Sequence, residues 1–142
     1  MPAYDPTNVF ARILRGEMPC HTVFENADTL ALMDIMPRSD GHVLVIPKAP
    51  ARNIFDVAAA DLCATYLTVQ KVARAATAAM EADGVTILHS NERAGGQVVF
   101  HLHVHVMPRW DGIPLRPHTG QMADPEGLKE QAARIRAALE KT

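Results

Sequence analysis

The chain has 142 residues, the usual size of one globular domain. Apolar residues make up 48% of it, enough for one hydrophobic core, and its formal net charge of −2 argues against binding to extended nucleic acid. No apolar run approaches the ~20 residues that span a bilayer, and the N-terminus reads as no secretory signal. Cys20 and Cys63 stand in no metal-binding or redox spacing, so we expect a cytoplasmic domain with reduced thiols and no membrane partner.

The first half of the chain predicts one short helix and three strands. Residues 6–15 place apolar side chains on one helical face, with Thr7 or Asn8 as the N-cap and Gly16 as the stop. The run His42–Pro47 is nearly all apolar, which is typical of a strand that is buried on both faces. The predicted strands are 22–25, 29–33 and 42–47.

The second half predicts a long helix and two more strands. Residues 57–83 are rich in alanine, with apolar side chains at helical spacing, and Gly84 is expected to end this helix. A short strand at 85–89 follows. After a polar loop at 91–96, residues 98–107 form the most strand-like segment of the chain.

The remaining residues are predicted to form a surface segment and a final helix. Pro108 is expected to end the last strand, and residues 111–125 should run over the surface because proline and glycine are frequent there. A final helix is predicted from Asp124 or Pro125 through Leu139. Hairpins together with a single long helix favour an α+β fold with an antiparallel sheet.

Three histidines alternate with aliphatic residues in the last predicted strand, at His101, His103 and His105. Because alternate side chains of a strand share a face, the imidazoles would line one face while the aliphatic residues enter the core. A row of imidazoles fills a core poorly, since each buried ring needs hydrogen-bond partners. The row therefore indicates either a metal site or phosphoryl chemistry, because imidazole is both a zinc ligand and a good nucleophile.

The flanking residues favour phosphoryl chemistry. Ala94–Gln97 directly precede the strand, and small residues there let backbone amides approach an oxyanion, while Gln97 adds an uncharged donor. His42 begins another predicted strand, so a fourth imidazole is expected to join across the sheet. No obvious cluster of Cys, Asp or Glu stands nearby in the sequence to complete a metal site.

These segments together resemble the histidine triad (HIT) family. The triad matches as HLHVHVM, and the further matching segments, in the family's order, are 9–19, 32–35, 41–48 and 91–97. The resemblance covers about residues 8–110 of a single domain spanning 1–142, and it leaves 111–142 as an irregular C-terminal extension. It implies an antiparallel meander sheet and usually a homodimer, for which the helix at 57–83 and the strand at 85–89 are the candidate interface.

The resemblance also implies a purine nucleotide as ligand and cleavage at its α-phosphorus. By matching position, His103 is the nucleophile, His101 and His105 are its flanking partners, and His42 supports them. Asp34 is the acid that holds the ribose hydroxyls. The polar groups implied near the phosphate are Asn91 and Gln97, and the apolar walls around the base are Val9, Phe10, Ile13, Leu32 and Ile35. The remaining histidines, His21, His89 and His118, match nothing in the family and are interpreted as surface or structural residues.

The predicted activity is hydrolysis or transfer through a nucleotidyl-histidine intermediate, with a nucleoside phosphoramidate or aminoacyl-nucleotide as substrate. The alternatives are a dinucleoside polyphosphate hydrolase and a non-catalytic nucleotide-binding or interaction protein, with a zinc protein third. Some bacterial members carry Cys-x-x-Cys in the first helix as part of a zinc site. Asn8 and Ala11 stand at those positions here, so we expect no structural zinc and no cofactor.

Overall fold

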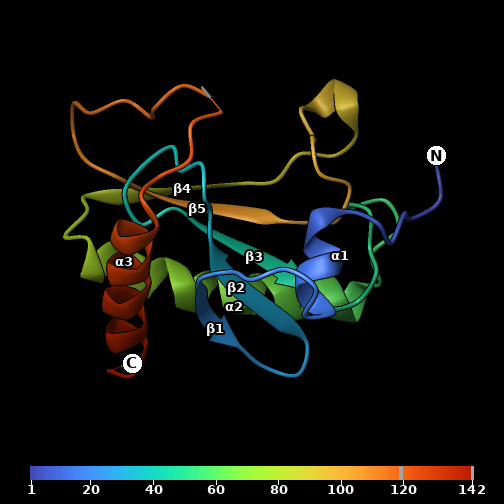
Figure 1. Cartoon of the computed structure of the whole chain (residues 1–142), viewed down its shortest axis with the longest axis horizontal. Helices are drawn as coiled ribbons and strands as arrows, with labels where there is room; N and C mark the ends of the chain where they lie inside the picture. Colours follow the sequence, from blue (N-terminus) through green and yellow to red (C-terminus); the bar gives the residue numbers. More distant parts are fainter. Residues whose placement is uncertain (119, 142) are drawn as a thin grey trace.

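The computed structural model describes residues 1–118 and 120–141. Five antiparallel strands form one open sheet in the order β1-β2-β3-β5-β4 (Figure 1). The strands are β1 (Thr22–Glu25), β2 (Thr29–Met33), β3 (Val43–Pro47), β4 (Gly84–Leu88) and β5 (Val104–Arg109). The first three follow one another along the chain, whereas β5 inserts between β3 and β4. The predicted α+β class with an antiparallel sheet is confirmed.

The two central strands β2 and β3 are buried on both faces, as the apolar run at 42–47 predicts. Their alternating side chains supply two separate clusters. On one face, Ala31, Met33, Val43 and Val45 pack with buried residues of α2 (Ala59–Ala79) and α3 (Pro125–Leu139). On the other face, Leu30, Leu32, Leu44 and Ile46 pack with Phe10 of α1 (Val9–Leu14). Figure 1 shows α2 behind the sheet and α1 in front of it.

The long helix ends earlier than predicted. Its last residue is Ala79, and Glu81 adopts a φ of 50° while the amide of Ala82 donates to the carbonyl of Thr77. This left-handed residue closes the final turn in the manner of a helix C-cap. Gly84 is therefore the first residue of β4 and not the helix stop.

The strand predicted at 98–107 is also displaced, because β5 begins only at Val104 and continues through Pro108 to Arg109. Before Val104 the ladders on both sides have stopped: β4 ends at Leu88 opposite His105, and β3 pairs only as far as Val45 opposite Val104, although it continues to Pro47. Pro108 is tolerated because β5 pairs there with β4 alone, the ladder to β3 having stopped at Val106.

The C-terminal extension is irregular only before its helix. The amide of Ala123 donates to Ile35 O (2.8 Å), and the amide of Arg116 donates to Arg38 O (2.8 Å), so this segment is tied to the loop after β2. Helix α3 then begins at Pro125, as predicted, and buries Leu128, Ala132 and Ile135 in the main core. Within residues 1–118 and 120–141, no helix is long and apolar enough to cross a membrane.

Candidate active site

The four expected histidines form one cluster, although they do not share one strand. Only His105 lies in β5, while His101 and His103 precede the strand and His42 immediately precedes β3. The ring centroid of His105 lies 5.1 Å from that of His103 and 5.2 Å from that of His42. The expectation that all three triad residues lie in one strand is therefore wrong, but the rings of His101 and His103 both lie beside Phe10 on the α1 face, as the alternation predicts. His101 is fully buried, and its ring nitrogens face Tyr4 and the end of β3.

His103 has the protonation pattern of a nucleophile. Its Nδ1 lies 2.7 Å from the carbonyl oxygen of His101, and because that oxygen can only accept, Nδ1 carries the proton. Burial lowers the pKa of His103 below its ordinary value, so the ring is neutral near pH 7. Its Nε2 therefore keeps an unprotonated lone pair. No group in the described part of the chain hydrogen-bonds to that nitrogen.

A directed hydrogen-bond chain reaches His105 from the loop after β2. The backbone N–H of Arg38 donates to His42 Nδ1 (3.0 Å), so a neutral His42 carries its proton on Nε2. That nitrogen lies 2.9 Å from His105 Nδ1 and donates to it. Burial, with the neighbouring imidazoles and Arg38, lowers the pKa of both His42 and His105 to about 3. Neutral His105 is thus left with an N–H at Nε2, on the side of its ring away from His42.

Asp34 lies directly after β2, beside this chain. Its Oδ1 accepts the amide of Met36 (2.9 Å), and its Oδ2 lies 3.4 Å from His42 Nε2. Burial raises the pKa of Asp34, against the lowering effect of the Met36 amide. Since His42 is neutral, this contact joins a carboxyl group to an uncharged imidazole and is not an ion pair.

Four of the five expected apolar wall residues lie together. Phe10 and Leu32 are buried in the cluster on the α1 face, with Val9 and Ile13 packed against it. The ring of Phe10 also lies 4.9 Å from that of His103, so this cluster borders His103. Ile35 is not a member of the cluster; it follows Asp34 and is 41% exposed.

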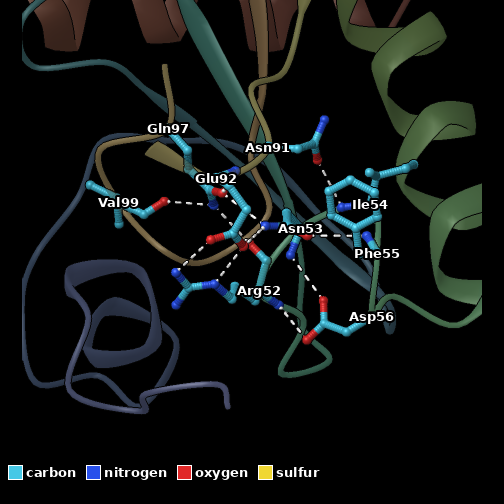
Figure 2. Close-up of polar contacts among 9 residues, drawn as sticks. All are labelled: Arg52, Asn53, Ile54, Phe55, Asp56, Asn91, Glu92, Gln97 and Val99. Atoms are coloured by element: carbon cyan, nitrogen blue, oxygen red, sulfur yellow. Dashed lines mark hydrogen bonds and ion pairs between the residues drawn. The ribbon is translucent and has the colours of Figure 1, made fainter. Parts of the chain in front are cut away.

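Gln97 does not have the expected role. Its amide nitrogen donates to the carbonyls of Arg52 (2.8 Å) and Val99 (3.0 Å), and its Oε1 accepts from the Glu92 amide (2.8 Å) and from Asn53 (3.0 Å). Both of its N–H groups are therefore used inside the protein, as Figure 2 shows, and none remains for a phosphate. Gln97 instead joins the loop before the triad to the loop after β3.

Asn91 is better placed to meet a ligand. Its Oδ1 accepts the backbone N–H of Ile54 (2.8 Å), which fixes the side chain. Figure 2 shows its amide nitrogen directed away from that contact. The expected role of Asn91 near the phosphate remains a prediction.

A clamp that the sequence does not indicate holds these loops. The Glu92 carboxylate accepts from Arg52 Nε (2.7 Å) and Nη2 (2.9 Å) and from Asn53 Nδ2 (2.6 Å) (Figure 2). Glu92 has φ 65° and ψ 165°, a region populated mainly by glycine, so its surroundings must stabilise this backbone. Residues 40 positions apart make this contact, and no motif spacing in the sequence indicates it.

The expected anion site at Ala94–Gln97 is also corrected. The amides of Gly95 and Gln97 donate to Glu92 O, and that of Gly96 donates to Arg93 O, so the turn uses its own N–H groups. After the turn, the amides of Val98 and Val99 find no acceptor within the described residues. Backbone N–H groups without an acceptor therefore occur slightly later in the chain than expected.

Two histidines interpreted as surface or structural residues lie near the site. His89, hydrogen-bonded to Tyr66, contributes to the lowered pKa of His103 and His105 after the effect of burial. His118 is exposed, and its Coulombic interaction lowers the pKa of His42, His105 and Asp34. His118 of the C-terminal extension therefore lies close enough to affect the electrostatics of the site. No linear motif in the sequence indicates this proximity.

The residues do not fit the zinc site of the cysteine-containing members. Asn8 is the N-cap of α1, and Ala11 is a buried apolar residue, so neither supplies a thiolate. Elsewhere in the described chain, donor atoms of Asp34, His42 and His105 lie within 4.8 Å of one another. There, His42 Nε2 and His105 Nδ1 lie 2.9 Å apart and are hydrogen-bonded to each other.

Comparison with known proteins agrees with this geometry. The HIT domain model matches residues 15–112. A Hit-like protein of Bartonella henselae aligns with a TM-score of 0.90 and 45% identity, over 96% of this chain and 99% of that chain. A Zn-bound histidine triad family protein of Mycobacterium smegmatis gives 0.85 and 34%, over 95% and 94%. The adenosine 5'-monophosphoramidase of Schizosaccharomyces pombe is 33% identical over 77% of this chain and 86% of its own length. The chain belongs to the HIT domain family.

Proposed function

We propose that this protein hydrolyses nucleoside phosphoramidates or related purine nucleotide conjugates at the α-phosphorus, through a nucleotidyl intermediate on His103. The observation that carries the proposal is the hydrogen bond from His103 Nδ1 to the carbonyl of His101. It fixes the tautomer of a neutral ring and leaves the Nε2 lone pair available for attack. The S. pombe relative, named as an adenosine monophosphoramidase, supports this class of substrate.

In the first half of the reaction, His103 Nε2 forms a bond to phosphorus while the bond to the leaving nitrogen breaks. The leaving nitrogen takes up one proton, which His105 is placed to pass from solvent because its Nε2 carries hydrogen. The same N–H, with the free amides of Val98 and Val99, stabilises charge on the phosphoryl oxygens. In the second half, water attacks phosphorus, the bond to His103 breaks, and one proton returns to solvent.

The nucleoside would lie between the α1 face and Asp34. The apolar cluster around Phe10 and Leu32 borders His103 and suits a purine ring, while the Asp34 carboxylate suits two ribose hydroxyls. Asn91 supplies an amide N–H near the phosphate. This arrangement favours a nucleotide over a general phosphate ester, because apolar and polar groups converge on one side of the nucleophile.

We further propose that the protein is a homodimer. A mainly apolar groove of about 720 Å³ runs between α2 and the edge strand β4. Val85 and Ile87 of β4 line it, and the unpaired edge of that strand can add to an equivalent edge. At the candidate interface named from the sequence, an exposed sheet edge and an apolar helix face thus adjoin.

The test is turnover of an adenosine phosphoramidate, with a search for an acid-labile nucleotide adduct by mass spectrometry of quenched enzyme. We expect the adduct on His103, and a loss of several orders of magnitude in turnover for His103→Asn, since nucleophile removal costs up to about a millionfold. The matched control His21→Asn, immediately before β1, should turn over normally. Binding of AMP without turnover by the wild type would instead assign a non-catalytic nucleotide-binding role.

A further inference from the structure

Tyr4 lies in the N-terminal segment, outside residues 15–112 that match the family model, yet it contacts the triad. Its hydroxyl lies 2.6 Å from His101 Nδ1, and it also lies 3.0 Å from Asn8 Nδ2. Its ring meets that of His101 edge-on at a centroid distance of 5.6 Å. Tyr4 is half-buried, whereas His101 is fully buried.

The protons of this contact can be assigned. His101 Nε2 lies 2.8 Å from Pro47 O, which can only accept, so Nε2 carries the proton of the ring. Burial lowers the pKa of His101 to about 4, so the ring is neutral and Nδ1 is an acceptor. The Tyr4 hydroxyl therefore donates to Nδ1, and the Asn8 amide donates to the Tyr4 oxygen. Every donor and acceptor along the line Asn8, Tyr4, His101, Pro47 is matched.

These hydrogen bonds hold a segment that lies outside the sheet ladders. Residues 98–103 precede β5, and Leu102 N to Ala51 O is the one backbone–backbone hydrogen bond donated by this stretch within the described residues. The side chain of His101, held at both nitrogens, fixes the stretch against β3 and the N-terminal segment, while Gln97 holds it at Val99 O. The carbonyl of the same residue accepts the proton of His103 Nδ1. The orientation of the nucleophile thus depends on how firmly His101 is held.

We propose that Tyr4 is a positioning residue for the nucleophile: by fixing the tautomer and place of His101, it holds the carbonyl that orients His103. The inference rests on the proposed role of His103. Tyr4 does not touch the substrate; it acts through His101. Asn8 supports it, since its amide orients the hydroxyl while its Oδ1 caps α1 through the amide of Ala11 (2.9 Å).

The test is Tyr4→Phe, which removes the hydroxyl and keeps the ring. We expect kcat to fall about tenfold, the effect of losing roughly one hydrogen bond, while AMP affinity stays within about twofold because the base and ribose residues are untouched. Two-bond ¹H–¹⁵N spectra should show changed ring-nitrogen shifts for both His101 and His103. Asn8→Ser, which keeps an N-cap oxygen, should give a smaller change in the same direction.

The chain offers a matched control in Tyr66→Phe. Tyr66 makes the same contact with His89 Nδ1 at 2.6 Å, but the pair does not hold the carbonyl that orients His103. We expect this variant to leave the ring-nitrogen shifts of His101 unchanged.

Three results would overturn the inference: unchanged kcat in Tyr4→Phe, equal losses in kcat and AMP affinity, or unchanged His101 and His103 signals. If Tyr4→Phe does not fold, Asn8→Ser decides by the same readouts. If the wild type cleaves no nucleotide conjugate, the proposed function fails, while the nitrogen shifts still decide the role of Tyr4.

Discussion

The assignment of Asp34 to the ribose gives a prediction whose size follows from the geometry. Asp34→Ala removes a carboxylate whose side chain is 18% exposed and whose Oδ2 faces the histidine cluster. A hydrogen bond to a charged group contributes roughly 1.5–3 kcal/mol. Because two hydroxyls share one carboxylate near solvent, we take about that range for the pair, and expect AMP affinity to fall roughly ten- to a hundredfold.

The same substitution has a second effect that the assay must separate. The Oδ1 atom accepts the amide of Met36, so Asp34→Ala also loosens the turn after β2. That loss acts on any ligand, whereas the ribose contact acts only on ligands with hydroxyls. Titration calorimetry with AMP and with its 2′,3′-dideoxy analogue, on wild type and variant, completes a cycle in which the turn effect cancels. Equal weakening of both ligands would refute the ribose assignment.

Two further predictions concern pH and assembly. The folded-state pKa values of His42 and His105, about 3, and of His101, about 4, lie below the unfolded value near 6.5. The unfolded chain therefore binds more protons than the folded chain between these pH limits. The free energy of unfolding should fall as pH drops below about 6.5, by roughly 1.4 kcal/mol per pH unit for each histidine. Equal urea midpoints at pH 5 and 7 would contradict this prediction. Ile87→Arg, in the α2–β4 groove, should convert the proposed dimer to a monomer in sedimentation at micromolar concentration, and a monomeric wild type would refute the proposed interface.

The sequence predicted elements best where local signals and tertiary partners agree. Strands β1 and β2 have the predicted bounds, because a turn at 26–28 separates two short apolar runs that pair with each other. The predicted long helix extends too far because the residues beyond Ala79 give no clear local signal for its end. In the structure, the left-handed Glu81 ends it. The run before Val104 has strong strand propensity, but β4 ends opposite His105 and the ladder to β3 stops at Val45.

Only part of the candidate site could likewise be predicted from the sequence. The alternating histidines predicted which residues would meet, and the buried aliphatic residues Leu102, Val104 and Val106 agree with the alternation. The groups that hold the site come from distant segments: Tyr4 is 97 residues from His101, and Arg52 is 40 from Glu92. Such contacts depend on how loops cross after the sheet has formed, so a single sequence carries no periodic signal for them.

The two hydrogen-bond lines explain how chemically similar histidines acquire different roles. One line runs from Asn8 through Tyr4 to His101, and the other from the Arg38 amide through His42 to His105. The Pro47 carbonyl fixes the direction of donation in the first line and the Arg38 amide fixes it in the second, because neither group titrates near pH 7. His105 consequently presents an N–H, and His103, bound through Nδ1 to a carbonyl, presents a lone pair. An N–H donor and a ring with a free lone pair, the proposed nucleophile, therefore adjoin at 5.1 Å between ring centroids, and the backbone determines which is which.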